Sequence, residues 1–146
     1  MPGNGTRFNF WGYDLPVHGQ LIDNGHSLSM YFDIDYMKQT FSEVFQDSPE
    51  EKTKHKINGG PFPEGAMYRL VQTHWHWGPN NSVGSEHTVD GRKYPLEVHM
   101  VHYNEKYPDL ETASLYPDGV AVNAFLYQVS WINQRYIRTF PPAVRK

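Results

Sequence analysis

Short stretches rich in aromatic and β-branched residues alternate along the chain with turn-forming Gly, Pro and Asn, a pattern typical of β-strands. The predicted strands are 8–11, 19–22, 27–32, 67–77, 94–103 and 119–130. Turn signals separate several of them, at 23–25, 78–81 and 89–92. We therefore predict a mainly β fold whose first strands follow one another as in a meander.

The segment 36–58 differs from its surroundings, because it is charged and poor in Gly. Within it, Ser48-Pro49-Glu50-Glu51 resembles the start of a helix, and lysines follow at 52, 54 and 56. We interpret this segment as an exposed insertion with some helical character. Its histidine, His55, and the earlier His18 are both expected on the surface.

Composition restricts the class of protein. The 146 residues suit one domain. Thirteen Lys and Arg against sixteen Asp and Glu give a net charge of -3, which does not favour nucleic acid or an anionic membrane as partner. We therefore expect a small-molecule partner. The sequence indicates no oligomeric state.

The sequence contains no cysteine, so any zinc site must use nitrogen and oxygen ligands. No stretch resembles a signal peptide, and no apolar run approaches the roughly 18 residues of a membrane helix. A cytoplasmic location is the default expectation for the chain as written.

Three of the eight histidines are spaced to meet at one point. Residues i and i+2 of a strand project from the same face, so His74 and His76 can both contact one ion. A neighbouring strand that contains His99 can supply a third imidazole. Three such ligands would leave the fourth tetrahedral position of zinc free, as in a catalytic site.

A His-x-His pair also arises by chance, and an isolated pair would seldom be a metal site. The neighbours of these histidines favour the metal interpretation. Gln72 lies on the strand face of His74 and His76, and Glu97 lies beside His99. Both can accept the second N–H of a ligating imidazole and so fix its orientation.

Three blocks of residues around these histidines form a family pattern. They read QTHWHWG at 72–78, GSEHTVDG at 84–91 and EVHMVHYN at 97–104. Together they closely resemble the α-class carbonic anhydrases, and shorter matches at 24–26, 59–61 and 117–122 extend the resemblance over residues 8–126. The resemblance implies the central, antiparallel-rich sheet of that family with few short helices, a mainly β (α+β) fold.

The resemblance also implies a zinc enzyme that reversibly hydrates carbon dioxide to bicarbonate and a proton. His74, His76 and His99 match the zinc ligands, and Gln72 and Glu97 match the residues that orient them. A zinc ion in such a site lowers the pKa of its bound water to about 7, so that a nucleophile is available at neutral pH.

Further positions match family residues with defined roles. His26 matches the proton-shuttle histidine, whose ordinary pKa near 6.5 suits proton transfer. Glu86 matches a buried carboxylate that orients a threonine hydroxyl beside the zinc ion. The apolar wall where carbon dioxide lies is matched by Val101, Val120 and Val122. Structural positions are matched by His87, His102 and Asn104.

The sequence also departs from the family pattern. The family domain is longer, so we expect 1–146 to be a single, truncated domain with an insertion at about 36–58 and a divergent tail at 127–146. The segment Ser-Leu-Thr-Thr-Pro-Pro, whose first threonine contacts the zinc-bound nucleophile in the family, has no clear match. Two alternatives therefore stand beside the active enzyme: a catalytically weak or inactive truncated isoform, and a carbonic anhydrase-related binding module.

Overall fold

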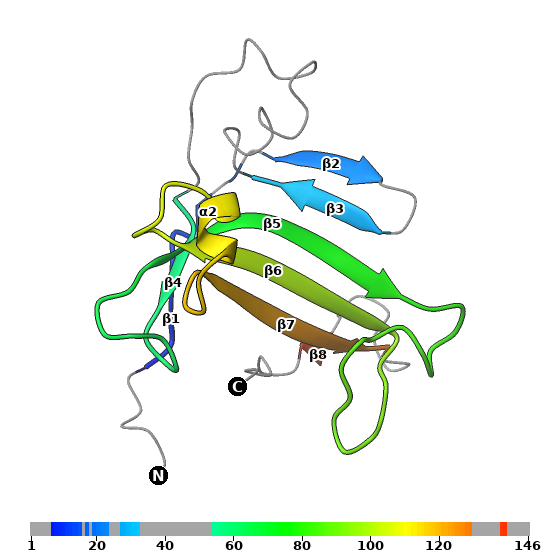
Figure 1. Ribbon diagram of the computed structural model, residues 1–146. Coiled ribbons are helices and arrows are strands. Elements are labelled where there is room, and N and C mark those ends of the chain that lie inside the picture. The colour runs from blue at the N-terminus through cyan, green and yellow to red at the C-terminus, as the bar shows by residue number, and fades with distance from the viewer. Residues whose placement is uncertain are drawn as a thin grey trace.

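A computed structural model describes residues 7–15, 17, 19–23, 27–32, 54–129 and 138–139 of the chain, and these form one antiparallel sheet (Figure 1). The strands are β1 (Asn9–Trp11), β2 (Gln20–Asp23), β3 (Leu28–Tyr31), β4 (Lys56–Asn58), β5 (Tyr68–Trp77), β6 (Leu96–Asn104), β7 (Val120–Gln128) and β8 (Arg138–Thr139). The predicted mainly β fold is confirmed. All six predicted strands are present, with ends that differ from the prediction by one or two residues.

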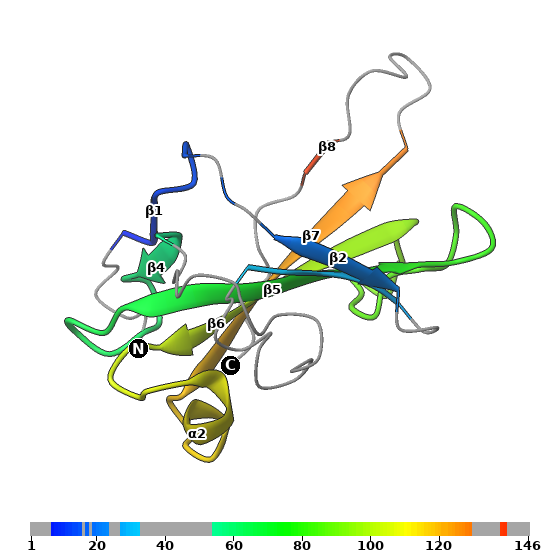
Figure 2. The same cartoon turned by 90° about the horizontal axis from the view of Figure 1, so that it is seen from above.

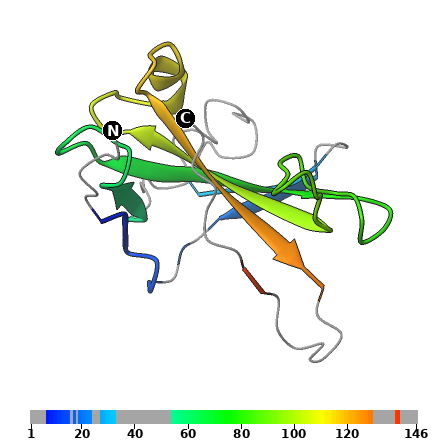
Figure 3. The same ribbon diagram turned by 90° about the horizontal axis from the view of Figure 1, so that it is seen from below.

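The main path of the sheet runs β1-β4-β5-β6-β7-β8. Strand β6 pairs with one edge of β5, and two strands share the opposite edge. There, β4 pairs with the first residues of β5, and β3 pairs with Gln72, Thr73 and His74. Figures 2 and 3 show the twist of the sheet, with β7 at a clear angle to β5 although only β6 separates them. The longest strands, β5, β6 and β7, are thus the centre of the fold.

Strand β4 corrects the sequence interpretation, because it lies inside the predicted exposed insertion. Ile57 is completely buried between β1 and β5, and His55 is only 5% exposed. The single apolar Ile57 among polar residues gave no periodic signal. The prediction that His55 lies on the surface is therefore wrong. Residues 36–53 and His18 lie outside the described residues.

A β-bulge in β5 determines which side chains face the histidine side of the sheet. Tyr103 of β6 pairs with Arg69, whereas Val101 pairs with Gln72, so the register shifts between Leu70 and Gln72. Cross-strand partners share a face, and one extra residue reverses the alternation. Even-numbered residues of β5 therefore lie on the face of His99 only after the bulge.

Two apolar clusters cover opposite faces of the sheet. Ile57, Tyr68 and Ala121 form one, with Phe8, Tyr13, Phe62 and Ala66 packed against them. Val71, Tyr103 and Ala113 form the other, with Tyr107 and Leu110. The second cluster includes the short helix α2 (Leu110–Ser114), whose first turn is capped by Asp109 through a 2.7 Å hydrogen bond from the Thr112 N–H. Helix α2 thus packs on the histidine face, but at the opposite end of β6.

Among the described residues, no helix is long and apolar enough to cross a membrane.

Candidate metal centre

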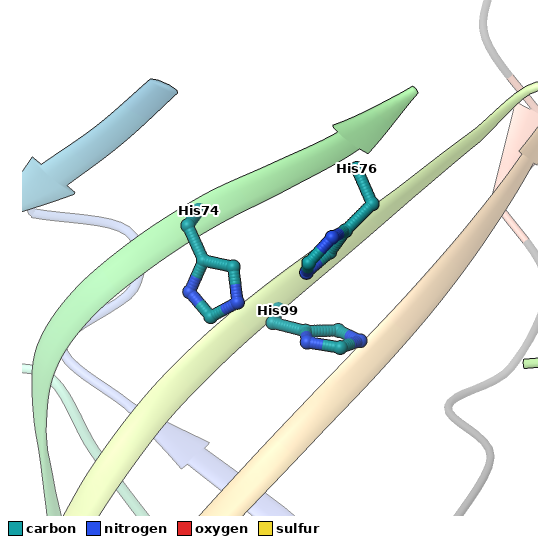
Figure 4. A group of neighbouring side chains, drawn as sticks. All are labelled: His74, His76 and His99. Carbon is teal, nitrogen blue, oxygen red and sulfur yellow. The ribbon is translucent and has the colours of Figure 1, made fainter. Parts of the chain in front are cut away.

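Three imidazoles converge on one face of the sheet (Figure 4). His74 and His76 come from β5, and His99 comes from β6. His74 lies directly opposite His99 in the strand register. The ring centroids are 4.9 Å apart for His74 and His76, 5.0 Å for His74 and His99, and 4.7 Å for His76 and His99. The predicted convergence is therefore present, and the period of two along β5 produces it.

Gln72 determines which nitrogen of His74 faces the cluster. Its Oε1 lies 2.7 Å from His74 Nδ1, and an amide oxygen can only accept, so the ring donates through Nδ1–H. In a neutral ring, Nε2 then carries the lone pair. The expected contact between Gln72 and His74 is thus present, and it leaves Nε2 as the nitrogen with the lone pair.

Glu97 has the same effect on His99. This carboxylate is completely buried, and its Oε1 lies 2.6 Å from His99 Nε2. Its Oε1 also contacts His87 Nδ1, and its Oε2 accepts the backbone N–H of His87 at 2.8 Å. Burial alone raises the pKa of the Glu97 carboxyl, but these hydrogen bonds outweigh it and hold the pKa below its usual value. The ionised carboxylate accepts the Nε2–H of His99, which leaves the lone pair on Nδ1.

The third imidazole supplies the most direct test of whether a metal fits. His76 Nε2 is buried and has no hydrogen-bond partner. An unpartnered buried nitrogen costs free energy unless another group satisfies it. One ligand nitrogen from each of the three rings lies within 4.8 Å of the other two. Neutral imidazole nitrogens are common zinc ligands, so the donor set fits a zinc ion.

The surroundings of His74 favour its neutral form. The pKa of His74 is lowered first by burial and then by its neighbours His99 and His76, while Glu86 acts in the opposite direction. A neutral ring keeps the lone pair that a metal requires. His74 therefore keeps its lone pair at neutral pH.

A second group of three ligand atoms belongs to His87, Glu97 and His99. Hydrogen bonds from both rings to Glu97 Oε1 already explain their proximity. This group therefore supports the first cluster, and it agrees with the structural role expected for His87.

The position of Glu86 corrects an expectation. The sequence predicted a buried carboxylate, but the side chain is 56% exposed at the rim of the cluster. Its Oε2 lies 3.6 Å from His76 Nε2 and 3.8 Å from His99 Nδ1. The residue belongs to the connection between β5 and β6, and it faces the imidazoles rather than a hydroxyl group of the described residues.

The predicted apolar wall lies on the face of His99. Val101 is two residues beyond His99 on β6 and pairs directly with Val122 of β7. Val120 precedes Val122 by two residues and shares its face, and Val120 and Val122 are 37% and 45% exposed. On this face, Val101 and Val122 follow the pair formed by His99 and Ala124, and Val120 lies one pair farther along, opposite Tyr103. His26, the predicted proton shuttle, lies outside the described residues.

Two comparisons with known proteins agree with this geometry. A family model of the eukaryotic-type carbonic anhydrases matches residues 3–145. The chain belongs to the carbonic anhydrase family. It is 49% identical over 110 residues to carbonic anhydrase 3 of Sus scrofa, a match that covers 75% of this chain and 35% of the relative. The chain thus spans about a third of that carbonic anhydrase.

Sequence reasoning missed two buried or half-buried contacts, one at Ser85 beside the site and one at Tyr13 on the opposite face of the sheet. Ser85 is buried, and its Oγ accepts the Tyr94 N–H at 2.9 Å and donates to the His87 carbonyl at 2.7 Å. It therefore holds together the two sides of the loop that contains Glu86. Tyr13 contacts His102 Nε2 at 2.5 Å across the opposite face. Its partner is 89 residues away, so no local signal predicted the contact.

Proposed function

We propose that this chain binds one zinc ion through His74, His76 and His99, and that the ion serves the reversible hydration of carbon dioxide to bicarbonate and a proton. The observation that supports the zinc site best is the set of three ring nitrogens, oriented at His74 and His99 by Gln72 and Glu97 and left unpartnered at His76. Membership of the carbonic anhydrase family supports the reaction.

Zinc supplies a Lewis acid that makes water nucleophilic at neutral pH. The other tasks fall to the chain. Gln72 and Glu97 fix the orientation of their histidines, and the cost of losing such a partner is typically 10–100-fold in metal affinity or activity. Val101, Val120 and Val122 offer carbon dioxide an apolar surface beside the ligands. His26 accepts the released proton and transfers it to solvent.

Stopped-flow measurement of carbon dioxide hydration tests the reaction. The zinc-loaded wild-type chain should exceed the rate of buffer alone, and His99→Ala should return the rate to that of buffer. A hydration rate that is the same with and without the zinc-loaded chain would reject the catalytic proposal. Metal analysis of the same samples would then show whether the zinc site survives without the activity.

One observation favours a second candidate, a catalytically weak isoform that binds zinc. Glu86 is largely exposed and lies against two ligand histidines, rather than being buried beside a hydroxyl group of the described residues. A carboxylate that is buried and preorganised beside a hydroxyl group at the site would typically contribute about a hundredfold in rate. A weak isoform would show a full zinc content and a hydration rate lower by that factor than that of a complete family enzyme.

A further inference from the structure

The connection between β5 and β6 begins with an exposed turn at Asn80. The Ser82 N–H donates to Asn80 Oδ1 at 2.9 Å, an Asx-turn, and the Val83 N–H donates to the Asn80 carbonyl at 3.4 Å. A Cβ on Gly78 would lie 2.3 Å from the Val83 carbonyl oxygen, so the two ends of the turn are in close contact. Asn80, Asn81 and Ser82 are all exposed. The turn thus presents three polar residues to solvent.

These three residues form the acceptor pattern for N-linked glycosylation, Asn-x-Ser/Thr with x other than Pro. The pattern alone arises often by chance, so accessibility and local conformation decide its weight. The Asn80 side chain is held through Oδ1, and its Nδ2 amino group takes no part in that hydrogen bond. The Ser82 side chain is exposed, and the Asx-turn uses its backbone N–H rather than its hydroxyl. Both groups that the pattern requires are therefore accessible.

We propose that Asn80 is an acceptor of an N-linked oligosaccharide, with an oligosaccharide carried on a lipid diphosphate as the class of donor. A bond forms between Asn80 Nδ2 and C1 of the first sugar, and Nδ2 loses a proton. The bond from C1 to the diphosphate oxygen breaks, and the lipid diphosphate leaves with its electron pair. The Ser82 N–H at Oδ1 stabilises the negative charge that the amide oxygen acquires as the proton leaves.

The turn suits this modification because it is local. Its hydrogen bonds join residues 80–83 only, so it does not depend on the rest of the sheet, and transfer can precede folding. In the folded chain Asn80 is exposed, so a bulky, polar oligosaccharide extends into solvent without displacing a packed side chain. Asn80 is not part of the histidine cluster. The glycan should therefore leave the zinc site intact.

A glycan on Asn80 also determines where the chain is made. Lipid-linked oligosaccharides are transferred to proteins in the secretory pathway, so the chain would have to enter it. A secretory location then replaces the cytoplasmic default expected from the sequence. A second match to the acceptor pattern, Asn4-Gly5-Thr6, lies outside the described residues and is removed in the test.

The test uses the full chain with Asn4→Gln as the background, produced in eukaryotic cells behind a cleavable secretory leader. It is compared with Asn80→Asp, Ser82→Ala, Ser82→Thr and the control Asn81→Gln in the same background. Mass spectrometry of the secreted chains and their peptides, before and after peptide N-glycosidase, measures the modification, because this enzyme converts a glycosylated Asn to Asp. Ser82→Ala retains the backbone N–H that closes the turn, so it removes the acceptor pattern and preserves the loop.

The background chain, Ser82→Thr and Asn81→Gln should carry a glycan at Asn80 that the glycosidase removes, and Asn80→Asp and Ser82→Ala should carry none. The natural chain, isolated from its source, should show the same glycan at Asn80. An unmodified Asn80 in the secreted background chain or in the natural chain would overturn the inference, as would a glycan that persists in Ser82→Ala. None of these outcomes depends on the zinc site.

Discussion

Glu97 is completely buried, and its Oε1 lies 2.6 Å from Nε2 of His99, which is on the same face of β6. The contact fixes the His99 ring so that Nδ1 faces His74 and His76. The same carboxylate contacts the backbone and the ring of His87. One buried carboxylate therefore connects the strand of His99 to the loop that contains Glu86.

Glu97→Gln should weaken zinc binding by about 10–100-fold, because an amide is a poorer acceptor for the His99 N–H and can present a donor to it. Competition with a chelator measures the affinity. Glu111→Gln, a carboxylate in the exposed first turn of α2, is the matched control and should leave the affinity unchanged. Equal zinc affinities for the two variants would show that Glu97 does not orient the ligand.

Tyr13→Phe should reduce the free energy of unfolding by about 1–3 kcal/mol, because it leaves a buried His102 nitrogen without a partner. His102 is completely buried, and its Nδ1–H donates to the Met100 carbonyl at 2.9 Å, so Nε2 accepts from the tyrosine hydroxyl. Urea denaturation measures the change. Tyr116→Phe, at a ring that is 50% exposed, should stay within about 0.5 kcal/mol of wild type. Similar losses in both variants would contradict the role of this contact.

Stability should fall with acid through the titration of His102. Burial lowers the pKa of His102 to about 4, below its ordinary value of 6.5. The unfolded chain therefore binds a proton more readily than the folded chain between these values, and stability is lost as pH falls from about 6.5 to about 4. The expected contribution is about 3 kcal/mol. Denaturation measured across this pH range should show that the free energy of unfolding changes less with pH in His102→Gln than in wild type. An equal change in both chains would contradict this prediction.

His26→Ala should slow carbon dioxide hydration most in dilute buffer, because it removes the proposed proton relay and retains the three metal ligands. Imidazole buffer should restore the rate by carrying the proton instead. Stopped-flow measurement at low and high buffer concentration tests both statements. A variant as fast as wild type in dilute buffer would remove His26 from the proposed mechanism.

The strands and the histidine cluster were predictable because their signals are local. Strand-forming residues between turn signals predicted the strands 67–77 and 94–103 that hold His74, His76 and His99, and a period of two brought the first pair to one face. Gln72 and Glu97 share that local pattern. Contact of each with its histidine two residues away is confirmed.

The remaining features depend on tertiary structure. Strand β4 has one buried apolar residue, Ile57, so its pairing with β1 and β5 left no mark in the sequence pattern. His55 is buried under Tyr13, with ring centroids 5.0 Å apart, a contact between distant segments. The exposure of Glu86 depends on the conformation of the loop between β5 and β6, where Ser85 accepts the Tyr94 N–H. Contacts between distant segments determine which of these side chains are buried, and local sequence propensity does not predict such contacts.

The central claim is that His74, His76 and His99 together form a zinc site. Metal analysis of the purified wild-type chain, His99→Ala and His26→Ala after equilibration with zinc and removal of the excess tests it most directly. The account predicts about one zinc per chain for wild type and His26→Ala, and a large loss for His99→Ala. A wild-type chain without zinc, or a His99→Ala variant with an unchanged zinc content, would contradict it.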